Sequence, residues 1–421
     1  MKATAAARVA LAMGALGLVS LPPAGAQARG SDRWRVEPFK LTSPRGDFEI
    51  GLAGYAQEDF RSFRDWTPVD PRTSELRRLR VGVEGRWKRL SFEVDVDPRS
   101  ERPEDTTEGT HHLKNAYLEI RLAKAFRIRG GHFKVPFSAE FLTSASKTDF
   151  MERSMIVDAL GLDRDWGGVV LGQIGNRVRY EAGVFQGDGW RAHQSAETTG
   201  TGRLMVTVLT GLDVAASYTE GQVEADPESL ASPEPKGFGA KGPAGFRFSG
   251  RHFVNGRRRR LGADGEFRRG PIGLTGEIAR GWEERKGQGA TFDDLPQALV
   301  TGWAVSATWL VSGDRKRNTI RPQHPVPHGA GAVELGVRYE SVRVDDDGPD
   351  TGFAGAGNRA RNIRLAGDQA FTGGLSWWPR QWMRFVGNVV VERFEDELLA
   401  PEAGRRGNYT TLLGRLQISL P

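Results

Sequence analysis

Cysteine is absent from the 421 residues, and after residue 26 no apolar run reaches the roughly 18–20 residues that a spanning helix requires. The lack of cysteine excludes a disulfide scaffold, so backbone pairing and packing must hold the fold together. The lack of a long apolar run leaves two classes for an exported chain, a soluble secreted protein or a transmembrane β-barrel.

A large excess of one charge is also missing. Lys2 and Arg8 precede the apolar run Val9–Leu21 and the cleavage signal Ala24–Ala26, which predicts a signal peptide over residues 1–26. Its removal takes two bases from a total of 59 and leaves 57 Lys and Arg against 53 Asp and Glu, a net charge of +4. So small an excess does not indicate a nucleic-acid partner, which needs a concentrated basic face.

Catalytic and metal-binding motifs are missing as well. No histidine stands in a Ser/His/Asp or H-E-x-x-H arrangement, and there is no nucleophile elbow, P-loop or zinc spacing. Glu93 and Asp95 share one strand face, as a glycosidase requires, but a polar lumen wall alternates in the same way. We therefore expect that the protein is not an enzyme and that it has no metal site and no cofactor.

Alternation of apolar and polar residues is the main pattern that is present. Sixteen segments with a period of two, from Phe48–Arg61 to Asn408–Leu420, are bounded by turn residues. In Glu75–Trp87, for example, Leu79 and Val81 fall on one face and Arg80 on the other. An even number of strands is what a bacterial single-chain barrel requires.

The connections between these segments alternate in length. Short links such as Thr210–Gly211 are separated by long polar ones such as Glu220–Gly256, which we expect to be extracellular. One departure is Ser312–Ala330, a long link on the side of the short periplasmic turns, which we expect to plug or line the inner mouth. These features predict an all-β fold, a 16-stranded antiparallel transmembrane β-barrel over residues 47–421, preceded by a short periplasmic segment over residues 27–46.

A soluble β-sandwich also shows alternation, because each of its strands has one buried and one wet face. Strand length, the asymmetry of the connections and tryptophans near strand ends favour a membrane barrel with aromatic girdles, the tryptophans being Trp87, Trp166, Trp282, Trp377, Trp378 and Trp382.

About thirty residues, Pro136–Asp165, interrupt the strand rhythm in the middle of this pattern. In a barrel, a long mid-sequence loop of this kind can fold inward and narrow the lumen. We therefore expect residues 136–165 to form a constriction.

Several separated motifs occur in order: LRRLRVGVEGRW (76–87), FEVDVDP (92–98), NAYLEIRL (115–122), GHFKVPFSAEF (131–141) and FMERS (150–154). Together they resemble the phosphate-selective porin O and P family over essentially the whole mature chain. The resemblance implies an outer-membrane porin, which is usually a homotrimer and is surrounded by outer-membrane lipids. Such a porin passes phosphate, polyphosphate or other small anions along lumen arginines and past an inward-folded loop.

The resemblance also implies roles for individual residues. Arg77 and Arg78 match the paired arginines of the strand motif, and Arg153 matches the arginine of the M-E-R motif in the narrowing loop. Ser144, Ser146 and Lys147 resemble the Ser/Lys phosphate cradle of that loop. Asp97, or alternatively Asp95, resembles the aspartate that faces the arginines.

Arginine suits an anion path because its planar fork donates two hydrogen bonds to an oxyanion. The candidates for the path are Arg77, Arg78, Arg80, Arg121, Arg129, Arg258 and Arg260. The plainer interpretation is that most inward-facing cations, among them Lys134, Arg338 and Arg415, pair with lumen carboxylates and fill the wall.

Two further alternatives stay open. The loop carries more carboxylates than cations, which favours a general or cation-tolerant pore; the carboxylates are Glu140, Asp149, Glu152, Asp158, Asp163 and Asp165, against Lys147, Arg153 and Arg164. Candidates of another class are a non-conducting barrel that acts as an adhesin or lipid enzyme, and a soluble secreted carbohydrate-binding β-sandwich.

Overall fold

The computed structural model describes residues 34–68, 73–99, 112–187, 198–224, 237–288, 293–346, 348 and 365–420. The signal peptide predicted over residues 1–26 lies outside the described residues. In the part of the chain that the structure describes, no helix is long and apolar enough to cross a membrane.

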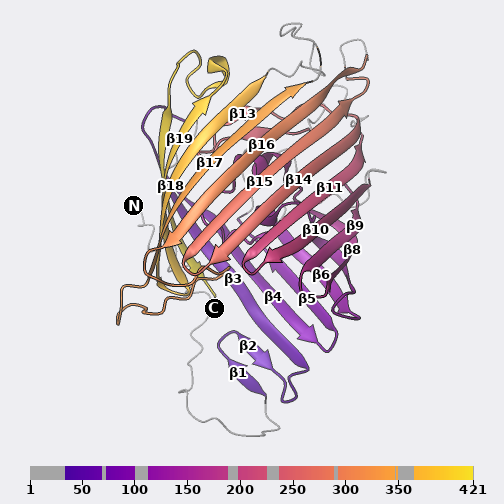
Figure 1. Cartoon of the computed structure of the whole chain (residues 1–421), viewed down its shortest axis with the longest axis vertical. Coiled ribbons are helices and arrows are strands. Elements are labelled where there is room, and N and C mark those ends of the chain that lie inside the picture. Colours follow the sequence, from indigo (N-terminus) through magenta and orange to yellow (C-terminus); the bar gives the residue numbers. More distant parts are fainter. Residues whose placement is uncertain are drawn as a thin grey trace.

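One antiparallel sheet closes into a barrel (Figure 1). Among the described residues this sheet has eighteen strands, of which β1 and β2 form an appended hairpin and the other sixteen form the wall. The seam closes where β20 pairs with β3, with Arg415 opposite Asp59. The wall strands are β3 (Phe48–Phe63), β4 (Ser74–Trp87), β5 (Leu90–Val96), β6 (Leu113–Arg121), β7 (Arg127–Lys134), β8 (Arg164–Ile174), β9 (Val178–Phe185), β10 (Thr199–Leu209), β11 (Leu212–Val223), β14 (Gly256–Arg269), β15 (Ile272–Arg285), β16 (Leu295–Leu310), β17 (Ala332–Asp346), β18 (Ala366–Arg380), β19 (Met383–Phe394) and β20 (Tyr409–Ser419). The predicted 16-stranded barrel is confirmed.

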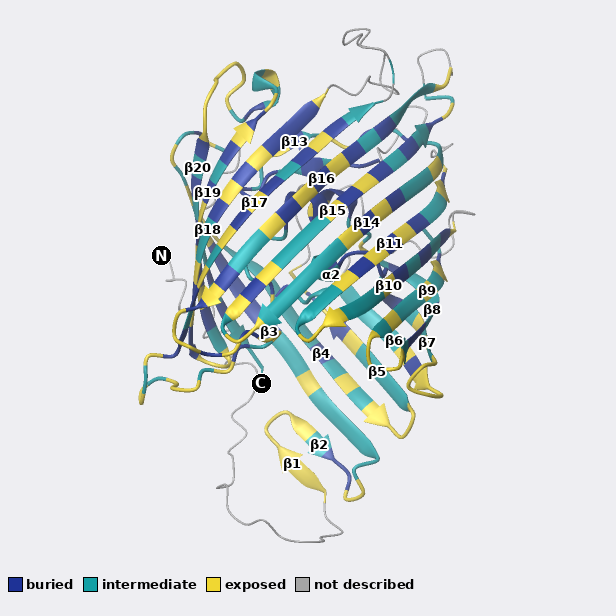
Figure 2. Ribbon diagram, viewed as in Figure 1, coloured by how far each residue is buried: buried dark blue, intermediate teal, exposed yellow. Residues whose placement is uncertain are grey.

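The outer face of the wall is apolar. Along β15, Ile272, Leu274 and Ile278 are exposed large hydrophobic side chains, whereas Glu283 on the inner face is buried. The same banding of buried and exposed residues runs along the neighbouring strands (Figure 2). Four exposed tryptophans lie at the end of the barrel that carries the short turns, namely Trp87, Trp309, Trp377 and Trp382. This is the arrangement of a barrel whose outside contacts hydrocarbon and whose tryptophans lie at the interface.

The connections differ at the two ends of the barrel. Short turns join β4 to β5, β8 to β9, β10 to β11 and β14 to β15, whereas long loops occupy the opposite end. The long link between β16 and β17 lies at the turn end. The segment before the barrel forms a hairpin of β1 (Arg35–Glu37) and β2 (Lys40–Thr42), which extends β3 through the pair Leu41 and Ile50 at the lower end of Figure 1.

The long loop between β7 and β8 folds into the barrel. It carries two short helices, α2 (Ala139–Leu142) and α3 (Met155–Leu160). Met155, Ile156 and Leu160 of α3 are almost fully buried and belong to one apolar cluster with Val300 and Val342 of the wall. β8 begins at Arg164, one residue before the expected end of the loop at Asp165, because Arg164 pairs with Lys134 in the ladder although it is polar.

The loop between β11 and β14 also folds inward in its described part. It carries β12 (Ala240–Lys241) and β13 (Arg247–Ser249), and Phe238, Ala244 and Phe248 join the apolar cluster around α3. Strands β15 to β20 of the wall supply most of the other members of this cluster. Each large apolar side chain buried there contributes about 1.5–3 kcal/mol relative to exposure. One side of the lumen is therefore packed with hydrophobic side chains.

Candidate functional site

The other side of the lumen is hollow and polar. A cavity of about 490 Å³ lies beside the two inward-folded loops, and we call it the loop-side cavity. A second cavity, of about 720 Å³, reaches the end of the barrel that carries the short turns, and we call it the turn-side cavity. Strands β4, β7 and β8 contribute side chains to both cavities, whereas β3, β5 and β6 line the turn-side cavity. A small solute therefore has room to pass along this part of the described wall.

The loop-side cavity is strongly basic. Of the described residues that line it, three are acidic, namely Asp158, Asp163 and Asp165. Ten are basic: Arg78, Arg80, Lys134, Arg153, Arg164, Lys241, Arg247, Arg251, Arg258 and Arg260. A cavity with this excess of positive charge raises the local concentration of anions.

Arg80, Lys134 and Arg164 line both cavities and so mark the junction between them. Lys134 ends β7 directly opposite Arg164, which begins β8. The Lys134 ammonium donates to the carbonyl oxygens of Phe141 at 2.5 Å, Leu142 at 3.2 Å and Thr143 at 3.0 Å, at the end of α2. These bonds fix its position beside the path.

The three junction cations differ in how they are held. Arg164 donates from Nε to Asn115 Oδ1 at 2.9 Å. The Arg80 guanidinium lies 5.6 Å from the centre of the Tyr55 ring and forms no hydrogen bond or ion pair with a described residue. Arg80 is thus the junction cation whose donors are left for a solute.

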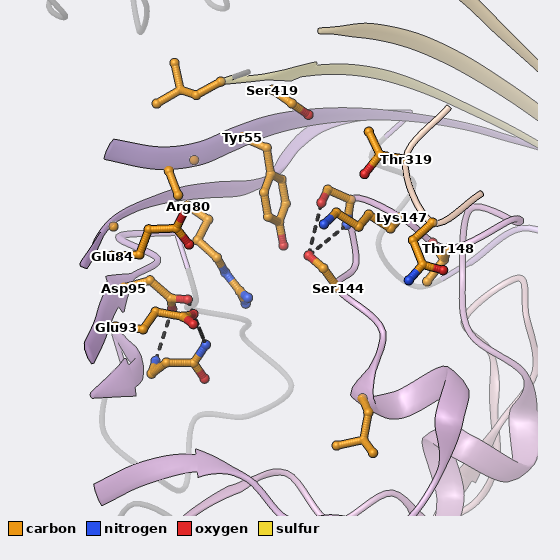
Figure 3. A pocket seen from close by; sticks show the side chains of 18 of the residues that line it. Tyr55, Arg80, Glu84, Glu93, Asp95, Ser144, Lys147, Thr148, Thr319 and Ser419 are labelled. Carbon is orange, nitrogen blue, oxygen red and sulfur yellow. Dashed lines mark hydrogen bonds between the residues drawn. The ribbon is translucent and has the colours of Figure 1, made fainter. Parts of the chain in front are cut away.

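The turn-side cavity brings together residues from the loop and from the wall (Figure 3). Ser144 and Ser146 lie with their hydroxyl oxygens 3.0 Å apart, and Lys147 follows them in the same turn. Lys147 forms no hydrogen bond or ion pair through its side chain with a described residue. Arg80 and Tyr55 lie between this turn and the wall that carries Asp95 (Figure 3).

Several inward-facing arginines hold the loop through its backbone carbonyl oxygens, and Arg384 among them also lines the turn-side cavity. Arg415 donates to Met151 O at 2.6 Å, and Arg384 donates to Thr148 O at 2.6 Å. Two more loop carbonyls are bound in the same way, Glu152 O by Arg338 at 3.0 Å and Phe137 O by Arg203 at 2.7 Å. Charge-assisted hydrogen bonds of this kind are about twice as strong as neutral ones. The wall therefore fixes the loop along most of its length.

Most carboxylates of the loop form ion pairs or hydrogen bonds with residues of the wall or of the loop itself. Glu152 lies 3.2 Å from Arg415 and 3.7 Å from Arg77, and Asp149 lies 2.6 Å from Lys316. Burial alone raises the pKa of the Glu152 carboxyl, but Arg77, Arg415, Arg78 and Arg61 together hold it well below its ordinary value. The acidic surplus of the loop sequence therefore does not produce an acidic constriction.

The remaining loop carboxylates also have partners. Glu140 accepts from Ser154 through both the backbone N–H at 3.0 Å and the hydroxyl at 2.7 Å. Asp158 lies 3.2 Å from Lys241 on the second inward-folded loop. The Glu140 contacts therefore hold the first loop together, and the Asp158 contact joins it to the second loop.

Arg77 and Arg78 both face the lumen although they are adjacent. The register of β3 and β4 shifts between Gln57 and Glu58, which leaves Arg77 as an extra residue in β4. Such a bulge turns two consecutive side chains to one face. Arg78 donates to Gln57 Oε1 at 3.0 Å and lines the loop-side cavity, whereas Arg77 is held between Asp59 at 3.9 Å and Glu152.

The structure distributes the other predicted residues over three places. Arg153, Arg258 and Arg260 line the loop-side cavity. The turn-side cavity is lined by Arg129, Asp95, Ser144, Ser146 and Lys147. Arg121 and Asp97 line neither cavity, and Asp97 accepts from the backbone N–H groups of Leu79 and Arg99, both at 3.2 Å.

Prediction from the sequence missed the roles of Arg164, Arg384, Arg203 and Tyr55. Arg203 and Arg384 each stand at an inward position of an alternating strand, which is the only signal they carry. The link Ser312–Ala330 was expected to plug or line the inner mouth, and its residues 316–321 line the turn-side cavity. Within the described ranges, no group of three or more His, Asp or Glu side chains is placed to hold a metal ion.

Solved structures with the same architecture are porins and other outer-membrane proteins. OmpT of Vibrio cholerae in its trimer form is 10% identical, with a TM-score of 0.56, and the match covers 89% of this chain and 99% of that one. An anion-selective porin from Comamonas acidovorans is 12% identical, with a TM-score of 0.54 and coverage of 89% and 100%. The outer membrane channel DcaP of Acinetobacter baumannii is 11% identical, with a TM-score of 0.55 and coverage of 89% and 97%. At these identities the likeness concerns the fold.

No match was found among curated proteins. A family match, by contrast, spans residues 50–418, which include all sixteen wall strands apart from the first two residues of β3 and the last residue of β20. With its closed barrel, inward-folded loop and polar lumen, the chain is an outer-membrane porin and belongs to the phosphate-selective porin O and P family.

Proposed function

We propose that this porin passes small anions by diffusion and prefers solutes that carry a phosphate group. The path runs from the loop-side cavity, past Arg80, Lys134 and Arg164, into the turn-side cavity. The observation that carries the proposal is that these three cations, and no described carboxylate, line both cavities. A solute that passes from one cavity to the other must therefore meet positive charge.

The attraction between an anion and the lining cations is strong enough to draw the anion in and weak enough to let it pass. An anion about 4 Å from one cation gains about 4 kcal/mol at an effective dielectric constant of roughly 20. Conduction requires each site to bind weakly enough to release the ion, which several moderate sites in series achieve. The loop-side cations form the entry, the junction forms the narrow part, and six carboxylates in the turn-side lining promote release: Glu84, Glu93, Asp95, Asp149, Glu181 and Glu334.

The rival function is a general or cation-tolerant pore. The same six carboxylates favour it, because they stand against nine bases in the turn-side cavity and make that cavity much less basic than the loop-side one. A non-conducting barrel is the rival of another class.

Current measurements in planar bilayers separate these functions. We expect a KCl gradient to give a reversal potential of anion preference, and millimolar phosphate to reduce the chloride current. A cation-preferring current that phosphate leaves unchanged would contradict the proposal and support the general pore. Correctly folded barrels that never conduct would support the adhesin or enzyme.

We further infer that the porin assembles as a homotrimer. The apolar outer face of the wall can pack against copies of itself, and a structure of the same fold, OmpT of Vibrio cholerae, is described in a trimer form. Native mass spectrometry of the protein extracted in mild detergent tests this, with a mass of three chains as the expected result and a single chain as the contrary one.

A further inference from the structure

The turn-side cavity has walls of opposite charge. Glu84, Glu93 and Asp95 stand on one side of Figure 3, and Lys147 with Ser144 stands on the other. Arg80 and Tyr55 lie between them. The cavity therefore has a negative and a positive wall a short distance apart, which a simple anion does not need.

The negative wall is not neutralised by direct ion pairs. Asn115 donates from Nδ2 to Glu93 Oε1 at 2.6 Å and to Asp95 Oδ2 at 2.9 Å, and its backbone N–H donates to Asp95 Oδ1 at 3.1 Å. Tyr117 donates its hydroxyl to Glu93 Oε2 at 2.7 Å. These donors are neutral, and neither carboxylate forms an ion pair with a described residue. Two carboxylates held together on one amide attract a cation.

Asn115 also keeps the positive charge of Arg164 apart from these carboxylates. Its amide oxygen accepts from Arg164 Nε at 2.9 Å, while its amide nitrogen serves Glu93 and Asp95. The width of one amide group thus separates a guanidinium from two carboxylates that could otherwise have paired with it. Both signs of charge persist in one cavity.

Tyr55 supplies an independent indication that a ligand fits here. Its side chain is 8% exposed, it lines the cavity, and its hydroxyl has no hydrogen-bond partner among the described residues. It stands opposite Arg80 in the β3–β4 ladder, and the Arg80 Nε is also without a partner. A buried polar group left unpaired costs about 1–3 kcal/mol, which a ligand that bonds to it recovers.

We propose that the turn-side cavity binds small zwitterionic solutes that carry a phosphonate or phosphate group together with an ammonium group. The anionic group meets Arg80, the Tyr55 hydroxyl and Lys147, and the ammonium group meets Glu93 and Asp95. This inference rests on the proposed function, because such a solute arrives through the same anion path. The inference adds a substrate class to that function, namely solutes whose ammonium group is attracted by the negative wall.

The test compares two blockers of the chloride current that differ only in the amine, 2-aminoethylphosphonate and ethylphosphonate. We expect the aminophosphonate to block at about tenfold lower concentration, which corresponds to about 1.4 kcal/mol from the ammonium contact. In the double variant Glu93→Gln, Asp95→Asn we expect this difference to disappear. The matched control Glu49→Gln removes a carboxylate of the same face outside both cavities and should keep the difference.

Each contrary outcome is distinct. Equal block by the two phosphonates in the unchanged protein would overturn the zwitterion site while leaving the anion pore intact. A difference that survives in the double variant would overturn its assignment to Glu93 and Asp95. Absence of block by both phosphonates and by phosphate, with no anion preference, would instead contradict the proposed function itself. Circular dichroism of the double variant in detergent confirms that its barrel has formed.

Discussion

Arg415 and Asp59 face each other across the seam of the barrel and form a buried, bidentate ion pair. The distances are 2.6 Å from Nε to Oδ1 and 2.8 Å from Nη2 to Oδ2. The same guanidinium donates from Nη1 to Met151 O at 2.6 Å and from Nη2 to Glu152 Oε1 at 3.2 Å. One side chain therefore closes the sheet and fixes the constriction loop.

Replacement of Arg415 should weaken both the closure of the sheet and the attachment of the loop. Arg415→Ala leaves the buried Asp59 without its bidentate partner and with only Arg77 at 3.9 Å, and breaking a buried pair costs about 3–5 kcal/mol. We expect a lower unfolding temperature, followed by the gel mobility shift of heated samples in detergent, and noisier single-channel current. Arg121→Ala, which lies outside both cavities, is the control and should behave as the unchanged protein. Equal stability of the two variants would contradict the role of Arg415.

Arg80→Ala should act on selectivity without a comparable loss of stability. Arg80 forms no hydrogen bond or ion pair with a described residue, so its removal leaves no wall carboxylate unpaired. We expect the phosphate concentration for half-block to rise about tenfold, since one charge contact with an oxyanion is worth about 1.5–3 kcal/mol. Arg80→Lys should give an intermediate value because a lysine keeps the charge but not the fork. Unchanged block in both variants would remove Arg80 from the path.

Lys134→Met should loosen the loop, although it also removes a junction cation. The carbonyl oxygens of Phe141 and Leu142 then lose their side-chain donor, whereas Thr143 O keeps the bond from Arg153. A buried unsatisfied group costs about 1–3 kcal/mol. We expect faster protease cleavage within residues 135–163, measured by mass spectrometry. Arg80→Ala is the matched loss of a junction cation and should leave the cleavage rate unchanged. Equal cleavage in both variants would count against the anchoring role of Lys134.

The pH dependence of the pore should follow Glu152. Its pKa in the folded protein lies below its ordinary value, so the stability it contributes is fully present above the unfolded pKa of about 4.3 and is lost as the pH falls through the folded value. Current noise should therefore stay constant from about pH 8 to pH 5 and increase only in stronger acid. Glu152→Gln mimics the protonated carboxyl and should show the increased noise already at pH 7. Quiet current in this variant would contradict the prediction.

Strand alternation, together with strand length and the asymmetry of the connections, was sufficient to predict the barrel, and the physical reason for the alternation is local. In Glu75–Trp87 successive residues face lipid and lumen in turn, so the order of apolar and polar residues indicates the two faces. The same rule would place Arg77 on the lipid face, since it shares the phase of Leu79. A bulge reverses this, and only the family resemblance indicated that Arg77 belongs inside.

Pairing across the lumen could not be predicted in this way. The carboxylates of the loop suggested an acidic constriction, yet Glu152 and Asp149 meet Arg415 and Lys316, which are far away in the sequence. Arg164 was counted with the loop because a polar residue at a strand start gives no alternation signal. Partners distant along the chain are set by the closed fold, which local patterns do not encode.

The apolar filling around α3 has a consequence for how the molecule can change. Wall residues from β15 to β20 supply most of the apolar cluster that packs one side of the lumen, whereas the turn-side cavity is lined largely by β3–β8. Because these two sets of side chains hardly overlap, substitutions in the hollow side can alter the admitted solute while the packed side preserves the fold. Such a barrel can acquire new permeability in small steps, with each intermediate still assembling in the membrane.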